Sequence, residues 1–61
     1  MRTKFYLVDR NGKSKKITKK EAMTMISKSQ FEEAKRIWML DPYVVNEYMV
    51  SGGRLRIEFE V

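Results

Sequence analysis

The C-terminal eight residues alternate strictly between charged and apolar side chains. The apolar set is Leu55, Ile57, Phe59 and Val61, and the charged set is Arg54, Arg56, Glu58 and Glu60. A period of two predicts a strand with one face in a core and the other in water. Such a strand needs neighbouring strands and a layer that covers its apolar face. The chain is therefore expected to contain a sheet.

The size of the chain limits what can surround that sheet. With 61 residues it is expected to form one domain, residues 1–61, with a thin core. It has no cysteine, so no disulfide and no thiolate metal site can stabilise it. A hydrophobic content of 43% nevertheless favours a folded domain over disorder.

The N-terminal part predicts a β-hairpin. The run Phe5 to Val8 is aromatic and branched and too short for a helix, so residues 3–9 are expected to form a strand. Asn11 and Gly12 supply a turn, after which residues 13–17 form a second strand. The apolar side chains of the first strand fall on both faces. The strand is therefore expected to be a central one, or its Tyr6 face is expected to be covered by a helix or by a dimer interface.

Two helices are expected after the hairpin. Thr18 and Glu21 have the spacing of a capping box and begin the first helix, in which Ala22, Met25 and Ile26 follow helical spacing. Ser29 and Glu32 repeat that spacing and are expected to begin the second, which ends at Asp41-Pro42 because proline disfavours a helical residue before it.

The segment 43–50 fits either of two structures. Its apolar residues have helical spacing, but its valines and the following Ser51-Gly52-Gly53 also suit the first arm of a hairpin. We expect a short helix with glycine as its stop. The predicted fold class is α+β: an N-terminal β-hairpin, two or three short helices and a C-terminal strand, with the helices on one face of a small antiparallel or mixed sheet.

The composition disfavours the common enzyme chemistries. The chain has neither histidine nor cysteine, which removes the usual zinc ligands and the usual general base near neutral pH. Glu58 and Glu60 could form a carboxylate pair, but pairing with cations across the sheet is the simpler interpretation. We therefore expect no enzymatic activity, no cofactor and no metal.

The positive charge is concentrated in the first half of the chain. Residues 1–30 carry nine Lys or Arg and two acids, whereas residues 31–61 carry four and six. The cations at the hairpin tip and the start of the first helix are the candidate site: Arg10, Lys13, Lys15, Lys16, Lys19 and Lys20. Lys19 and Lys20 would oppose the helix dipole, and this cost suggests a use. We expect these side chains to contact nucleic-acid phosphates; the alternative is a solvated face that serves solubility.

A second hypothesis concerns the aromatic and methionine residues. The candidates are Trp38, Met39, Tyr43 and Tyr48. If so small a core cannot bury all of them, the surplus would form a patch for a protein partner or for a homodimer. On this alternative the chain is an interaction or inhibitory protein that docks on an acidic protein surface, steered by the same lysines.

The N-terminal segment gives an expectation about location. Only four apolar residues in a row precede Asp9, too few for a signal peptide or a membrane span. A cytoplasmic location without membrane contact is therefore expected.

Overall fold

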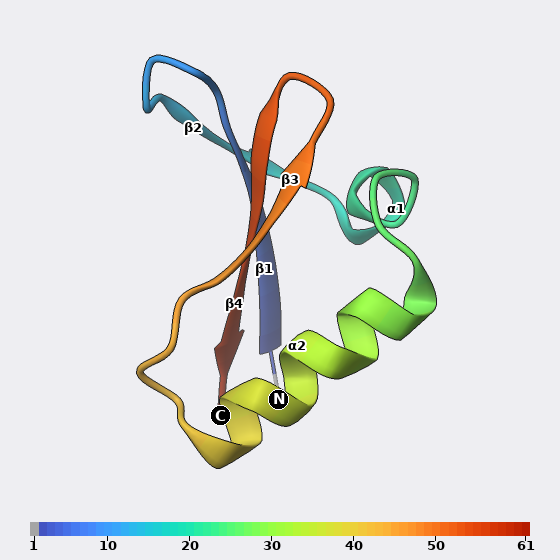
Figure 1. The fold of residues 1–61 in the computed structure, drawn as a ribbon, viewed down its shortest axis with the longest axis vertical. Helices are drawn as coiled ribbons and strands as arrows, with labels where there is room; N and C mark the ends of the chain where they lie inside the picture. Colours follow the sequence, from blue (N-terminus) through green and yellow to red (C-terminus); the bar gives the residue numbers. More distant parts are fainter. Residues whose placement is uncertain (1) are drawn as a thin grey trace.

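The fold is a four-stranded antiparallel sheet with two helices, in a computed structural model that describes residues 2–61 (Figure 1). The elements in chain order are β1 (Arg2–Val8), β2 (Ser14–Ile17), α1 (Lys19–Ala22), α2 (Lys28–Leu40), β3 (Asn46–Val50) and β4 (Gly53–Glu60). The strand order is β2-β1-β4-β3, so the first and last long strands are central neighbours. The α+β class, the N-terminal hairpin and the C-terminal strand are confirmed.

One face of the sheet forms the core with both helices. Phe5 of β1 pairs with Ile17 of β2 and with Ile57 of β4, so three apolar side chains stand in a row across the sheet. The buried cluster joins these strand residues to helix and loop residues: Phe5, Ile17, Ala22, Ile26, Ala34, Leu55, Ile57 and Phe59. Small alanines on both helices allow close approach to the sheet. The apolar alternation of β4 is thus explained by burial.

The opposite face of the sheet is open. Tyr6 stands on it and pairs with Lys16 of β2 and Arg56 of β4. Both helices pack on the Phe5 side, so neither covers Tyr6. Of the alternatives given for this strand, the central position is confirmed, since β1 lies between β2 and β4, and the covering helix is wrong.

Two glycine-containing turns fix the register of the hairpins. In the first, Asp9 Oδ1 accepts hydrogen bonds of 2.9 Å from the backbone N–H groups of Asn11 and Lys13, and Gly12 has a φ of 81°. In the second, Gly53 has a φ of 148°, and a Cβ there would overlap the carbonyl oxygen of Val8. Only glycine fits this position, because β1 passes directly over its backbone.

Three expectations about local structure are corrected. Residues 43–50 do not form a helix, since Asn46–Val50 is β3 and pairs with β4. The first helix is a single turn, Lys19–Ala22, and does not continue to Ile26. The second helix is capped by Ser27 and Gln30 and not by Ser29 and Glu32. Neither helix among residues 2–61 is long and apolar enough to cross a membrane.

Candidate functional site

The predicted cations form one continuous surface segment. Residues 10–20, which we call the basic segment, contain six cations and no acid: Arg10, Lys13, Lys15, Lys16, Lys19 and Lys20. All six are exposed. The basic segment runs from the β1–β2 turn along β2 to α1 (Figure 1). Because β2 is an edge strand, no further strand among residues 2–61 shields it from a ligand.

The pleat of β2 divides the lysines between the two faces of the sheet. Lys16 pairs with Tyr6 on the open face, whereas Lys15 pairs with Leu7 on the helix-covered face. Lys19 Nζ lies 5.3 Å from the centre of the Phe31 ring, at a distance suited to a cation–π contact. The cations therefore surround an edge of the molecule instead of forming one flat patch.

The structure weakens one argument for a function of Lys19 and Lys20. The capping box is present, because the Glu21 N–H donates to Thr18 Oγ1 at 3.1 Å and the Thr18 N–H donates to Glu21 Oε1 at 3.2 Å. However, α1 has only one turn, so both lysines belong to its last turn as well as to its first. The cost against the helix dipole is therefore small.

The ion pairs lie elsewhere, on the open face of the sheet. The three found among residues 2–61 are Lys4–Glu60 at 2.7 Å, Arg56–Glu58 at 3.3 Å and Arg54–Glu47 at 3.4 Å. Each glutamate of the open face thus has a cation beside it. None of the three pairs involves the basic segment, although Lys16 is close enough to Glu60 to contribute to its lowered pKa.

The Lys4–Glu60 pair is close enough to change the protonation of both groups. Its hydrogen bond, and secondly the opposite charge, raises the pKa of Lys4 above 10.5 and lowers the pKa of Glu60 below 4.5. The two side chains are 32% and 43% exposed, so solvent screens the interaction and limits its contribution to stability. Glu60 is nevertheless ionised over the whole neutral range.

Tyr6 is flanked by cations on the open face of the sheet. The Arg56 guanidinium lies 5.2 Å from the centre of the Tyr6 ring, a distance typical of a cation–π contact. The same guanidinium is held by Glu58. The ring is therefore already in contact with a protein group on the surface where a nucleic-acid base would stack.

The predicted aromatic and methionine patch is divided by the fold. Trp38 is partly buried, with its ring centre 5.6 Å from that of Phe59. Tyr48 is also partly buried, and its hydroxyl donates to the Gln30 carbonyl at 3.0 Å. Met39 and Tyr43, in contrast, are 69% and 92% exposed.

Sequence reasoning missed the remaining exposed apolar residues of this region. Leu40, Val44 and Val45 are 87%, 42% and 66% exposed. Together with Met39 and Tyr43 they form an apolar strip around the turn at Pro42, between α2 and β3. The strip could have been found from the sequence, because a proline turn that follows a helix directly leaves few core contacts for the residues around it.

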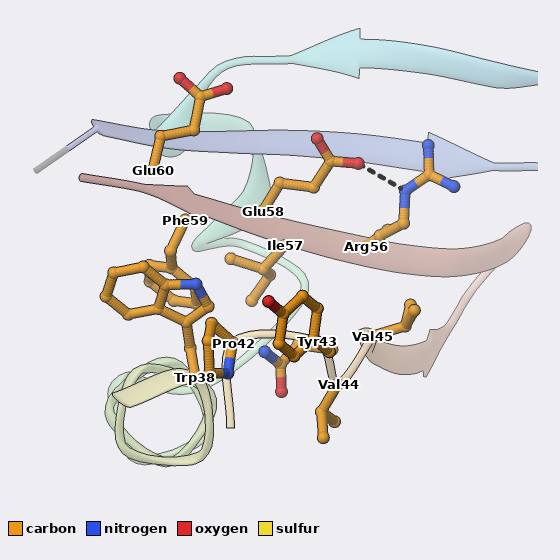
Figure 2. A pocket seen from close by; sticks show the side chains of 11 residues that line it. Trp38, Pro42, Tyr43, Val44, Val45, Arg56, Ile57, Glu58, Phe59 and Glu60 are labelled. Carbon is orange, nitrogen blue, oxygen red and sulfur yellow. Dashed lines mark ion pairs between the residues drawn. The ribbon is translucent and has the colours of Figure 1, made fainter. Parts of the chain in front are cut away.

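A groove of about 330 Å³ lies between this strip and β4 (Figure 2). Its lining comes from the end of α2, the loop and β4: Trp38, Pro42, Tyr43, Val44, Val45, Asn46, Arg56, Ile57, Glu58, Phe59 and Glu60. Asn46 is only 5% exposed, and its Nδ2 atom has no hydrogen-bond partner among residues 2–61. A buried donor without a partner costs about 1–3 kcal/mol. Nothing in the sequence signals this donor.

The groove follows an unpaired edge of β4. Residues Glu58–Glu60 pair with β1 on one side. On the other side β3 begins at Asn46 opposite Ile57, so no described strand pairs with residues 58–60 there.

The described residues offer no metal centre and no similarity to known proteins that would assign a function. Residues 2–61 contain no group of three or more Asp, Glu, His or Cys that could hold a metal ion. Glu58 and Glu60, the carboxylate pair considered above, are engaged by Arg56 and Lys4. No protein-family model matches the chain, and searches of curated proteins and of solved structures found no match.

Proposed function

We propose that this protein is a non-enzymatic nucleic-acid-binding protein whose basic segment contacts phosphate groups. One observation carries the proposal: six exposed cations occur within residues 10–20 without an acid between them, and none takes part in the ion pairs of the described residues. Acids of the sheet neutralise other cations, yet leave this segment positive.

The shape of the basic segment favours contact with the phosphate backbone over recognition of bases. Its cations surround an edge strand and a turn, and no helix there is long enough to enter a groove of DNA. Binding should therefore tolerate many sequences and weaken steeply with salt, because each neutralised phosphate releases counterions. Six phosphate contacts would give a slope of log K against log salt of about −5 for duplex DNA and about −4 for a single strand.

The test is a salt series of fluorescence anisotropy with labelled single-stranded and duplex oligonucleotides of about 20 nucleotides. The variant is Lys13→Glu/Lys16→Glu, which reverses two exposed charges of the basic segment. The control is Lys35→Glu/Arg36→Glu on α2, which changes the net charge equally but outside the segment. Circular dichroism checks that both variants fold.

The wild-type protein and the α2 control should bind both oligonucleotides at low salt, whereas the basic-segment variant should bind about tenfold or more weakly and with a shallower salt slope. Absence of binding at low salt contradicts the proposal. An equal loss in both variants also contradicts it, because net charge alone would then explain the affinity.

The protein-docking alternative has different support. The apolar strip lies at the end of the molecule away from the β1–β2 turn (Figure 1). Glu58 and Glu60, not the lysines of the basic segment, line the groove beside the strip. A docking function through Met39 and Tyr43 is therefore better matched to a basic partner than to an acidic one.

A further inference from the structure

The two edge strands of the sheet, β2 and β3, differ in how they are protected against the addition of another strand. An edge strand exposes backbone N–H and C=O groups that a further strand can pair with, and lysines are a usual means of preventing this. The β2 edge has such lysines, since Lys15 and Lys16 lie in the strand and Lys13 lies directly before it. β3, with the sequence Asn-Glu-Tyr-Met-Val, contains one charged residue and neither lysine nor proline. It is therefore the edge of the described sheet that is open to a further strand.

Exposed apolar side chains accompany the free backbone of β3. Met49, the fourth residue of the strand, is 82% exposed. Val45, directly before the strand, is exposed as well. A strand that pairs with this edge would bring its own side chains against both, and the contact would remove apolar surface from water.

The sequence of β3 is complementary to itself in an antiparallel pair. With Tyr48 opposite the Tyr48 of a second copy, Glu47 lies opposite Met49 in both halves of the pair. Asn46 then lies opposite Val50, so all five residues of the strand are paired. No like charges are opposed in this register, whereas a pair centred on Glu47 would bring two carboxylates together.

The charges beside Met49 favour the approach of a second copy. Arg10 and Arg54 line a hollow next to Met49, and Glu47 of the second copy would come opposite that methionine. Arg54 already contacts Glu47 of its own chain at 3.4 Å, but Arg10 takes part in none of the ion pairs of residues 2–61. The acid of the hollow, Asp9, accepts hydrogen bonds within its own turn. The carboxylate of the second copy would therefore meet two guanidinium groups, one of them without an ion pair.

The remaining positive charge of the protein lies where this contact avoids it. A net charge of +5 makes two copies repel each other in general. The lysines of the basic segment lie on and beside β2, which β1 and β4 separate from β3. Pairing through β3 therefore keeps the lysines of the two copies at opposite ends of the joined sheet.

We propose that this protein forms a weak symmetric dimer in which β3 pairs antiparallel with β3 of a second copy, centred on Tyr48. The pairing joins two four-stranded sheets into one of eight strands. Two strands of five residues bury less surface than a stable dimer requires, so the association depends on protein concentration. The dimer does not depend on nucleic-acid binding.

Pairing of β3 with the β2 edge of another copy is the main competing arrangement. It would place Lys15 and Lys16 against a strand with one carboxylate, Glu47, and leave one lysine without an opposite charge. Such a head-to-tail contact also leaves a free edge at each end, so it adds further copies without closing. The size of the assembly therefore distinguishes the two arrangements.

The test is sedimentation equilibrium at protein concentrations from about 10 µM to about 1 mM, a range that covers weak dimers. Met49→Glu places a carboxylate opposite Glu47 in both halves of the pair. Its matched control is Met39→Glu, because Met39 is also exposed, lies on α2 and gives the same change of net charge. Met49→Lys places a cation opposite Glu47 and tests the register. In an equal mixture of two differently labelled samples, NMR contacts between Glu47 of one copy and Met49 of the other report the pairing directly.

The average mass of the wild type should rise with concentration from that of one chain towards that of two, and the labelled mixture should show the contacts between copies. Met49→Glu should raise the dissociation constant about tenfold. Met39→Glu should dimerise as the wild type does, and Met49→Lys at least as tightly. Lys13→Glu/Lys16→Glu should still dimerise, which separates this proposal from that of nucleic-acid binding.

Four results would overturn the proposal. The first is the mass of a single chain at every concentration. The second is an assembly that grows beyond two copies, which would assign β3 to the β2 edge. The third is an equal effect of Met49→Glu and Met39→Glu, which would place the contact outside β3. The fourth is a loss of the dimer in Met49→Lys as large as that in Met49→Glu, which would exclude the register centred on Tyr48.

Discussion

At the scale of single residues, Tyr48 connects the late part of the chain to the start of α2. Its ring packs against the core, and its hydroxyl reaches the Gln30 carbonyl and, at 3.2 Å, Glu33 Oε1. These contacts hold β3, an edge strand, against the helix that covers the sheet. Tyr48 therefore contributes to the position of the groove, because β3 begins at Asn46 only two residues earlier.

Replacing Tyr48 by Phe should lower the free energy of unfolding by about 1 kcal/mol, the usual net contribution of such a hydrogen bond. Urea denaturation followed by Trp38 fluorescence measures this. Tyr43→Phe is the control, because Tyr43 is 92% exposed and should lose almost nothing. Equal stability of the wild type and Tyr48→Phe would show that the hydroxyl contacts do not stabilise the fold.

The same residue should make stability depend on alkaline pH. Burial, and then the charge of Glu33, raises the pKa of Tyr48 above 10.0. A raised folded pKa means that the contribution is complete below pH 10.0 and is lost as the pH rises through the folded value. The stability difference between the wild type and Tyr48→Phe should therefore shrink above pH 10.0. A difference that is constant across that range would contradict the raised pKa.

At the scale of elements, the errors of sequence interpretation have a common physical cause. The spacing of a capping box occurs twice at the start of α2, with Ser27 and Gln30 and with Ser29 and Glu32. Local spacing cannot choose between them. The earlier box gives α2 an extra half turn, and Ala34 and Phe31 of the resulting helix pack against the sheet.

Segment 43–50 is a second case in which local spacing cannot choose between two structures. Its residues fit helical spacing and strand alternation equally, and β3 forms because the Ser51-Gly52 turn returns the chain along β4.

The basic segment is contiguous in sequence, so its position could be predicted from the sequence. The groove could not be, because it exists only where β3 starts too late to pair with the end of β4.

The competition between the two caps can be measured. Ser27→Ala removes the side chain that accepts from the Gln30 N–H at 3.1 Å, and should cost about 1 kcal/mol of stability. Ser29→Ala, two residues later and inside the helix, should be neutral or slightly stabilising because alanine has the higher helix propensity. The reverse order of the two effects in urea denaturation would show that α2 begins at Ser29 in solution.

At the scale of the whole molecule, the cations that form ion pairs and those that do not lie in different places. The ion pairs of the described residues all lie on the open face of the sheet, whereas the six cations of the basic segment lie around one edge of the sheet and take part in none of these pairs. The net charge is +5 on 61 residues, so the cations of the basic segment repel one another without compensation from the rest of the chain. A thin core gives little stability to offset such repulsion.

Salt should therefore stabilise this protein, although it weakens the proposed binding of nucleic acid. Raising NaCl from about 20 mM to about 200 mM shortens the screening length below the span of the basic segment, and we expect a gain of about 0.5 kcal/mol in the free energy of unfolding. Lys13→Gln/Lys16→Gln should be more stable than the wild type at low salt and should gain less from added salt, because two of the repelling charges are gone. Urea, which is uncharged, is the suitable denaturant. If salt instead destabilises the wild type, the attraction within the ion pairs of the open face outweighs the repulsion within the basic segment, and the prediction is contradicted.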